Sequence, residues 1–155
     1  MRFLLVLAVL IVPALVAANP DTDVEVPGTA PSATPAGPTA ESRFNQGQAL
    51  ARQNDWTGAA AAYRDATRLR PAFPEAWNGL GHALRKQGRF DESVTAYHEA
   101  LRLRPAYAQA LEYLGEAYVQ LGRLAEARDV LERLTPLDPK EADELARAIA
   151  KAAKR

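Results

Sequence analysis

Residues 74–105, PEAWNGLGHALRKQGRFDESVTAYHEALRLRP, decide the fold of this chain of 155 residues. Apolar side chains recur in them at helical spacing, in two runs formed by Trp77, Leu80 and Leu84 and by Val94, Tyr97 and Leu101. Gly88 stands between the runs, where glycine allows the left-handed backbone with which a chain leaves a helix. The stretch therefore predicts two helices joined by a tight turn.

The same pattern returns at a constant step on both sides of this stretch. Glycine recurs at Gly47, Gly81 and Gly115, and the same step relates Pro71, Pro105 and Pro139. Proline has no amide hydrogen to donate and disfavours helix in the residue before it, so each of these prolines should close a second helix. We therefore predict three helical hairpins over residues 40–73, 74–107 and 108–141.

Small and large residues alternate between the two helices of the middle hairpin. Gly81 on the first helix, with Ser93 or Ala100 on the second, lets the backbones approach, and Tyr97 fills the space beside them. Each hairpin keeps an apolar face that only a neighbouring hairpin covers. The predicted fold is thus all-α, an α-solenoid of three stacked hairpins.

A further helix should cover the end of the solenoid, over residues 142–155. Its apolar stripe is narrow and consists of Ala142, Leu145, Ile149 and Ala152. Asp138 is placed to cap this helix and Pro139 to stand in its first turn. Pro136 should end the preceding helix early, because proline interrupts the helical hydrogen bonds.

Residues 1–39 differ from the repeats. Residues 1–18 hold one cation, Arg2, and an apolar run that ends in small residues, which predicts a cleaved signal peptide. An uncleaved N-terminal anchor is the alternative, although the run is shorter than a membrane-spanning helix needs. Residues 19–39 are rich in proline, alanine and threonine without apolar periodicity, so we expect a disordered linker.

The composition excludes several kinds of function. Basic and acidic residues balance at 19 each, so the chain lacks the positive charge that nucleic-acid binding requires. Cysteine is absent, which removes disulfides, thiolate metal sites and cysteine nucleophiles. The two histidines, His82 and His98, fall on different helices and provide too few ligands for zinc. We expect no enzyme activity, no metal and no cofactor.

These features resemble the tetratricopeptide repeat family, whose repeating unit has the same length as the step between the glycines. The middle hairpin carries the residues on which the resemblance rests, namely Trp77, Leu80, Gly81, Leu84, Ser93, Tyr97, Ala100 and Pro105. In the first hairpin Arg43 and Gln46 stand where the family has Trp and Leu. An outermost hairpin has no predecessor to cover, so polar residues there can face water.

The resemblance implies a concave groove, lined by the first helix of each hairpin, that binds a peptide or protein partner. Glu75 and Gln109 would lie at its rim. Its lining would consist of Phe44, Gln48, Arg52, Asn78, His82, Arg85, Lys86, Glu112, Glu116 and Gln120. Cations gather toward one end and acids toward the other, which would orient a polar peptide. Two alternatives remain, because these residues also suit solvated helix faces and Phe44 also suits the core of the first hairpin.

One subgroup of this family clamps a C-terminal carboxylate with a set of Lys, Asn, Asn, Lys and Arg. The corresponding positions here hold Phe44, Gln48, Gly79, Gln109 and Tyr113, and none of them matches. We therefore expect a different partner, bound by a non-catalytic adaptor that a bacterium exports to its periplasm or cell envelope. The alternative function is a structural module through which an envelope complex assembles or the chain associates with itself.

Overall fold

The computed structural model describes residues 37–154, so the predicted leader and most of the predicted linker lie outside the described residues. The described part is all-α, without strands. Its seven helices are α1 (Ala40–Arg52), α2 (Trp56–Leu69), α3 (Pro74–Lys86), α4 (Phe90–Leu103), α5 (Ala108–Gln120), α6 (Leu124–Leu134) and α7 (Pro139–Ala152). None of these helices is long and apolar enough to cross a membrane.

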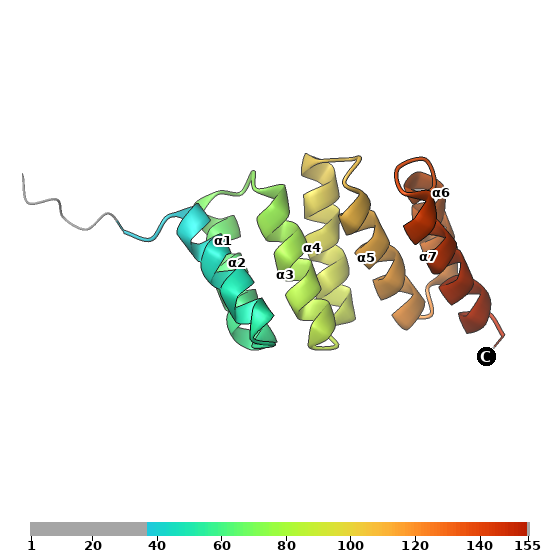
Figure 1. Cartoon of the computed structure of the whole chain (residues 1–155), viewed down its shortest axis with the longest axis horizontal. Helices are drawn as coiled ribbons and strands as arrows, with labels where there is room; N and C mark the ends of the chain where they lie inside the picture. The colour runs from blue at the N-terminus through green and yellow to red at the C-terminus, as the bar shows by residue number, and fades with distance from the viewer. Residues whose placement is uncertain (1–36, 155) are drawn as a thin grey trace, which may run out of the picture. The chain divides into compact units, whose positions relative to one another are not determined.

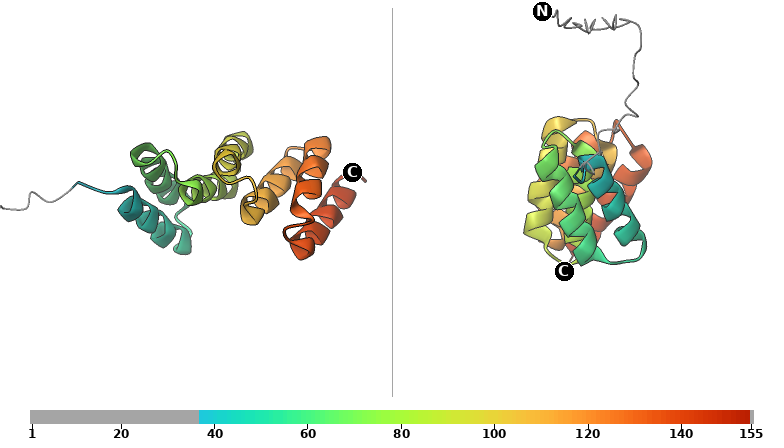
Figure 2. Two further views of the ribbon diagram at one scale, coloured as in Figure 1. Left: turned by 90° about the horizontal axis from the view of Figure 1, so that it is seen from above. Right: turned by 90° about the vertical axis from the view of Figure 1, so that its left-hand side faces the viewer.

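The helices form two layers, with α1, α3, α5 and α7 in front of α2, α4 and α6 (Figures 1 and 2). We call the first set the inner helices and the second the outer helices. Neighbouring inner helices approach one another closely along the whole row, whereas within residues 37–154 the backbones of the outer helices stay farther apart. Because the inner layer is the more closely spaced, it forms the concave side.

Three residues reverse the chain inside the hairpins, each with a positive φ. They are Asn54 at 61°, Gly88 at 75° and Gly122 at 71°, in the left-handed region that glycine and asparagine tolerate. The first turn also carries a side-chain cap, because Asp55 Oδ1 accepts a hydrogen bond of 2.9 Å from the Gly58 amide. The reversal that the sequence predicted at Gly88 is confirmed.

The core follows the predicted pairing of small and large residues. Tyr97 is fully buried, and a Cβ added at Gly81 would lie 2.6 Å from its ring. Tyr63 lies in the same way between Gly47 of α1 and Gly79 of α3. A Cβ added at Gly47 would lie 2.7 Å from the Tyr63 ring, and one added at Gly79 would lie 2.8 Å from it. Glycine is therefore required at these positions by the closeness of the helices.

An ion pair joins the two helices of each of the first two hairpins, at the end where the inner helix begins. Arg70 contacts Glu41 at 2.5 Å and lies over the ring of Phe73, with 3.7 Å between Cζ and the ring centroid. One repeat later, Arg104 contacts Glu75 and lies over Tyr107 at 4.7 Å. The arginine after each of the first two outer helices thus joins that helix to the inner helix of its own hairpin, and packs on the residue that precedes the next inner helix.

The C-terminal end confirms the predicted effects of Pro136 and Asp138. Helix α6 ends at Leu134 after 11 residues, while α2 and α4 have 14 residues each. Asp138 accepts a hydrogen bond of 3.2 Å from the Glu141 amide. Helix α7 therefore begins at Pro139, earlier than the boundary at residue 142 that results from counting equal repeat units.

Candidate functional site

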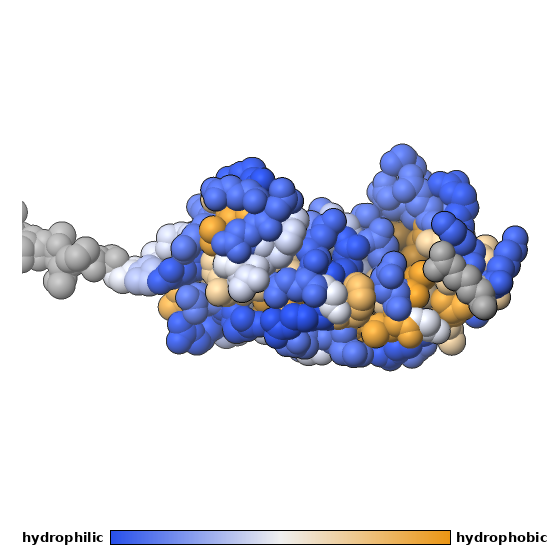
Figure 3. All heavy atoms as spheres, turned by 90° about the horizontal axis from the view of Figure 1, so that it is seen from below, coloured by the Kyte–Doolittle hydropathy of each residue, from blue (hydrophilic) through white to orange (hydrophobic). Residues whose placement is uncertain are grey.

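The inner helices enclose a depression of about 250 Å³ on the concave side. It is lined by Phe44, Gln48, Tyr63, Glu75, Asn78, Gly79, His82, Tyr107, Gln109 and Tyr113. Figure 3 shows the concave side in profile, lower in the middle than at its mostly hydrophilic ends. We call this depression the central pocket. It brings together Phe44, Gln48, Asn78 and His82 of the predicted lining and both predicted rim residues.

A row of three aromatic rings includes two that line the pocket, His82 and Tyr113. The His82 ring lies 5.5 Å from that of Trp56 and 5.0 Å from that of Tyr113, on which it stacks at 29°. Burial, and then the positive charges of Arg85 and Lys86, lower the pKa of His82 to about 4. His82 is therefore neutral at pH 7 and acts as an aromatic surface rather than as a cation.

Asn78 is buried rather than exposed in the groove, with 6% of its surface accessible. Its amide donates to Gln109 Oε1 at 2.9 Å and lies 3.4 Å from the Tyr107 hydroxyl, so it connects α3 with α5. Its carbonyl oxygen is buried without a hydrogen-bond partner in the structure. Asn78 thus positions the pocket wall, and its role toward a ligand stays a prediction.

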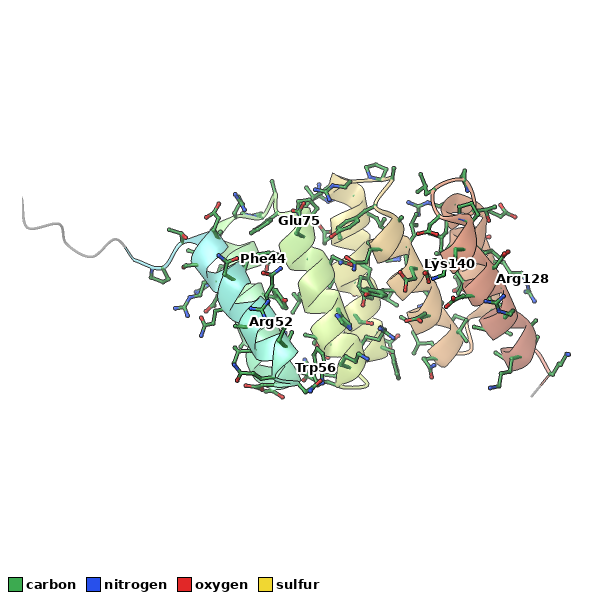
Figure 4. The ribbon with its side chains drawn as sticks, in the orientation of Figure 1. Phe44, Arg52, Trp56, Glu75, Arg128 and Lys140 are labelled. Atoms are coloured by element: carbon green, nitrogen blue, oxygen red, sulfur yellow. The ribbon has the colours of Figure 1, made fainter. Side chains whose placement is uncertain are left out.

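Phe44 fits both alternatives that the sequence left open, the core of the first hairpin and the lining of the groove. Its ring lies 4.9 Å from Phe73 and 5.7 Å from Tyr63, so it contributes to the core of the first hairpin. The side chain is only partly buried and also lines the central pocket. Figure 4 shows Phe44 and Arg52 on α1, with Glu75 near the start of the neighbouring inner helix. An aromatic ring held in this way is preorganised for contact with a ligand.

The predicted charges are partly neutralised within the protein. Arg85 forms an ion pair of 2.7 Å with Glu116 and lies over the Tyr113 ring at 5.1 Å. Arg52 and Lys86 are exposed and form no ion pair within residues 37–154. Lys86 lies 5.8 Å from the Trp56 ring. The cationic end of the groove therefore consists mainly of Arg52 and Lys86.

The acidic residues of the prediction lie in a second depression, between α5 and α7, which we call the acidic slot. Its volume is about 130 Å³, and its lining is Glu112, Glu116, Glu141, Glu144, Leu145 and Ala148. Burial, and then the charges of Glu141 and Glu116, raise the pKa of Glu112 to about 7. Gln120 lies in a third depression with Lys151, so the predicted lining is distributed over three places.

Three tyrosines, Tyr63, Tyr107 and Tyr113, line the pocket although the predicted lining does not include them. The sequence could have predicted Tyr113, because it directly follows Glu112 of the predicted lining and stands one repeat after Gly79, which also lines the pocket. Tyr63 could not be assigned from its position, since a core tyrosine of an outer helix reaches the pocket only through the gap that Gly47 and Gly79 leave.

The histidines and the acidic residues of the described part are the side chains that could hold a metal ion. No group of three or more His, Asp or Glu residues in the range 37–154 is arranged to hold a metal ion. His98, the second histidine, lies away from the pocket and contacts the Tyr118 hydroxyl at 2.8 Å.

Comparison with known proteins agrees with this architecture. The sequence profile of the tetratricopeptide repeat matches residues 44–92 and 78–142. No curated protein gave a significant match.

Among solved structures, three similar ones contain bound partners. The first TPR of Spaghetti (RPAP3), bound to HSP90 peptide SRMEEVD, has 24% identity and a TM-score of 0.71, over 76% of this chain and 94% of that one. The TPR2B domain of yeast Sti1 in its pHsp70 complex has 22% identity and a TM-score of 0.69, over 74% and 96%. The second TPR domain of human RPAP3, in complex with HSP70 peptide SGPTIEEVD, has 23% identity and a TM-score of 0.68, over 75% of this chain and 96% of that one.

At these identities the structural likeness establishes the fold alone. TPR domains are generally non-catalytic binding modules, and those just described are bound to peptides or partners. The profile matches cover more than half of the 155 residues. On this evidence the chain belongs to the tetratricopeptide repeat family.

Proposed function

We propose that this protein is a non-catalytic adaptor that holds an extended segment of a partner protein on its concave side. The observation that carries the proposal is the central pocket, to which the inner helices of all three hairpins contribute, with an aromatic row through His82 and Tyr113. A rigid, preformed surface of this kind lowers the entropic cost of binding. The peptide-bound TPR structures support the same use of the fold.

The charges around the pocket give the proposed ligand a direction. Arg52 and Lys86, both without an ion-pair partner in the described part, would meet acidic side chains of the ligand. The acidic slot at Glu112 would meet basic ones. A peptide with an acidic and a basic end should therefore bind in one orientation, since complementary charges mainly set register and specificity.

We also propose that the adaptor works in the bacterial cell envelope or periplasm. The support is the composition of residues 1–18, an early cation followed by an apolar run and small residues, which is typical of a signal peptide. Sequencing the N-terminus of the mature protein, isolated from envelope and soluble fractions, tests this. A mature chain that begins near Asn19 supports a cleaved signal, whereas an intact Met1 in the membrane fraction supports an anchor.

Site-specific photo-crosslinking in cells tests the groove. The crosslinking amino acid is introduced at Gln48, which is exposed and lines the central pocket, and as a matched control at Arg128, which is exposed on α6. We expect a defined partner to be captured from position 48 and not from position 128. Capture from Arg128 alone would show that the outer surface binds, and the groove proposal would then be wrong.

A structural assembly module is the alternative function, in which copies or repeat proteins stack through the ends of the solenoid. The outward face of α7 is largely exposed and carries Lys140, Asp143 and Arg147, which disfavours an apolar stacking contact there. Light scattering over a concentration series distinguishes the two functions. A constant monomer mass supports the adaptor, and a mass that rises with concentration supports the assembly module.

A further inference from the structure

The contact between α5 and α7 combines close apolar packing with a concentration of carboxylates. Leu145 of α7 lies directly against α5, since a Cβ added at Gly115 would be 2.4 Å from Leu145 Cδ2. Glu112 and Glu116 flank Gly115 on α5, and both line the acidic slot with Glu141 and Glu144 of α7. The helix that covers the end of the solenoid is therefore held beside four carboxylates.

Three of these carboxylates have cationic partners. Glu116 pairs with Arg85 of α3 at 2.7 Å, and Lys140 lies 2.8 Å from Glu141 and 3.7 Å from Glu144. Arg147 also reaches Glu144, at 4.0 Å. Glu112 has no ion pair within residues 37–154. Of the four, it is the group whose charge is not compensated by a direct contact.

The charges that face Glu112 come from its own helix and from two others. Glu116 lies on α5, Arg85 on α3, and Glu141 on α7, with Asp138 at the start of α7. Three of the four are negative, and part of the Glu112 side chain is removed from water, which makes its ionised form costly. Ionisation of Glu112 therefore acts directly against the seating of α7.

We propose that the contact between α5 and α7 is a proton-controlled latch, in which α7 is held on α5 while Glu112 is protonated and loosens when Glu112 ionises. The raised pKa of Glu112, about 7, places this change in the neutral range. A carboxyl group whose pKa is higher in the folded state stabilises fully below its unfolded pKa, and this stabilisation is lost as the pH rises through the folded value. The latch therefore loosens on the alkaline side.

The latch does not depend on the proposed function, but it has a consequence for the groove. Glu116, which lines the slot, holds Arg85, and Arg85 lies over the ring of Tyr113 in the central pocket. Movement of α7 would change the electrostatic surroundings of this ion pair. The acidic end of the groove is thus the part that responds to pH.

Hydrogen exchange of the full chain between pH 6 and pH 8 tests the latch, with rates corrected for the intrinsic effect of pH. For a pKa raised from 4.5 to about 7, we expect protection of the α7 amides to fall about tenfold over this range. Amides of α1, which contains no histidine, should change much less. E112Q should remove the pH dependence of α7, while the control E132Q, which alters an exposed residue of α6, should keep it.

Two results would overturn the proposal. One is protection of α7 that is constant with pH in the wild type, and the other is an unchanged pH dependence in E112Q. Should E112Q fold poorly by circular dichroism, carbon-detected NMR titration of the wild-type Glu112 carboxyl decides the question. A midpoint near 7 supports the latch, and a midpoint near 4.5 contradicts it.

Discussion

At the scale of single residues, the solenoid depends on glycines that face large side chains of another helix. Gly47 and Gly81 each face the tyrosine of their own hairpin, Tyr63 and Tyr97. Gly115 differs, because the residue that fills its space is Leu145 of α7. The small residue is common to all three repeats, while the side chain that it faces depends on the position of the repeat in the array.

Replacing Gly81 by alanine tests this arrangement. The new Cβ would lie 2.6 Å from the ring of Tyr97, which is fully buried. We expect G81A to lower the free energy of unfolding by about 1–3 kcal/mol, despite the better helix propensity of alanine. Urea unfolding measures this, and G37A, with no atom within 4 Å of its Cβ, is the control. Equal stability of G81A and wild type would contradict the close packing.

His82 gives the pocket a pH dependence opposite to that of the latch. Its folded pKa, about 4, lies below the unfolded value, so the stability it contributes is present above about pH 6.5 and is lost as the pH falls toward 4. Comparing wild type with H82Q cancels the contribution of Glu112. We expect the wild type to lose about 1 kcal/mol of unfolding free energy relative to H82Q from pH 7 to pH 5. This value is smaller than the full pKa shift implies, because solvent screens the partly exposed ring.

The measurement is a series of chemical denaturation curves at each pH. H98Q serves as the control, since His98 lies outside the central pocket and its replacement leaves the rings of Trp56 and Tyr113 in place. It should keep the contribution of His82. A difference between wild type and H82Q that does not vary with pH would show that His82 is not shielded from water.

At the scale of helices, the sequence was most informative where a rule acts locally. The constant step between repeats located the hairpins, Pro136 predicted the short α6, and Asp138 predicted the start of α7. The site was less predictable. The burial of Asn78 depends on Gln109 and Tyr107 from the next repeat, and the slot around Glu112 depends on how α7 docks. Both are set by contacts between elements that periodicity does not encode.

The ion pair between Arg104 and Glu75 tests what joins the two helices of the second hairpin, α3 and α4. Both side chains are partly exposed, so a double-mutant cycle with R104A and E75A should give a coupling of about 0.2–1 kcal/mol. R104A alone should cost more than E75A, because it also removes the packing on Tyr107. Thermal unfolding of the four proteins gives these values. Equal losses in the two single variants would show that Arg104 acts only through its charge.

At the scale of the whole domain, the concave side differs in chemistry from the carboxylate clamp found in one subgroup of the family. None of the residues that line the central pocket is Lys or Arg. The five positions of the carboxylate clamp hold Phe44, Gln48, Gly79, Gln109 and Tyr113. A C-terminal carboxylate entering this pocket would lose its hydration without gaining a cation in return.

We therefore expect the HSP90 peptide SRMEEVD, with which the first TPR of Spaghetti was solved, to bind this protein at least tenfold more weakly than that domain. Isothermal titration calorimetry measures both under the same conditions. A peptide with an amidated C-terminus is the control, because it should bind this protein no worse than the free acid. Comparable affinity of the two proteins for SRMEEVD would mean that cations outside the pocket, such as Arg52 and Lys86, replace the clamp.

The covering helix α7 should determine whether the three hairpins remain folded. Deleting residues 138–155 uncovers the surface of α5 and α6 on which Ala142, Leu145 and Ile149 are buried. Loss of the two large side chains alone should lower the free energy of unfolding by about 3–6 kcal/mol, at about 1.5–3 kcal/mol for each. Circular dichroism and urea unfolding measure the stability of the truncated protein, and L145M, which nearly conserves the side-chain volume, is the control.

Because the stability of a repeat protein adds up from contacts between neighbouring repeats, the loss should be largest in the third hairpin. Hydrogen exchange should show α5 and α6 losing protection before α1 and α2. Uniform loss of protection along the array would show instead that the hairpins unfold as one unit.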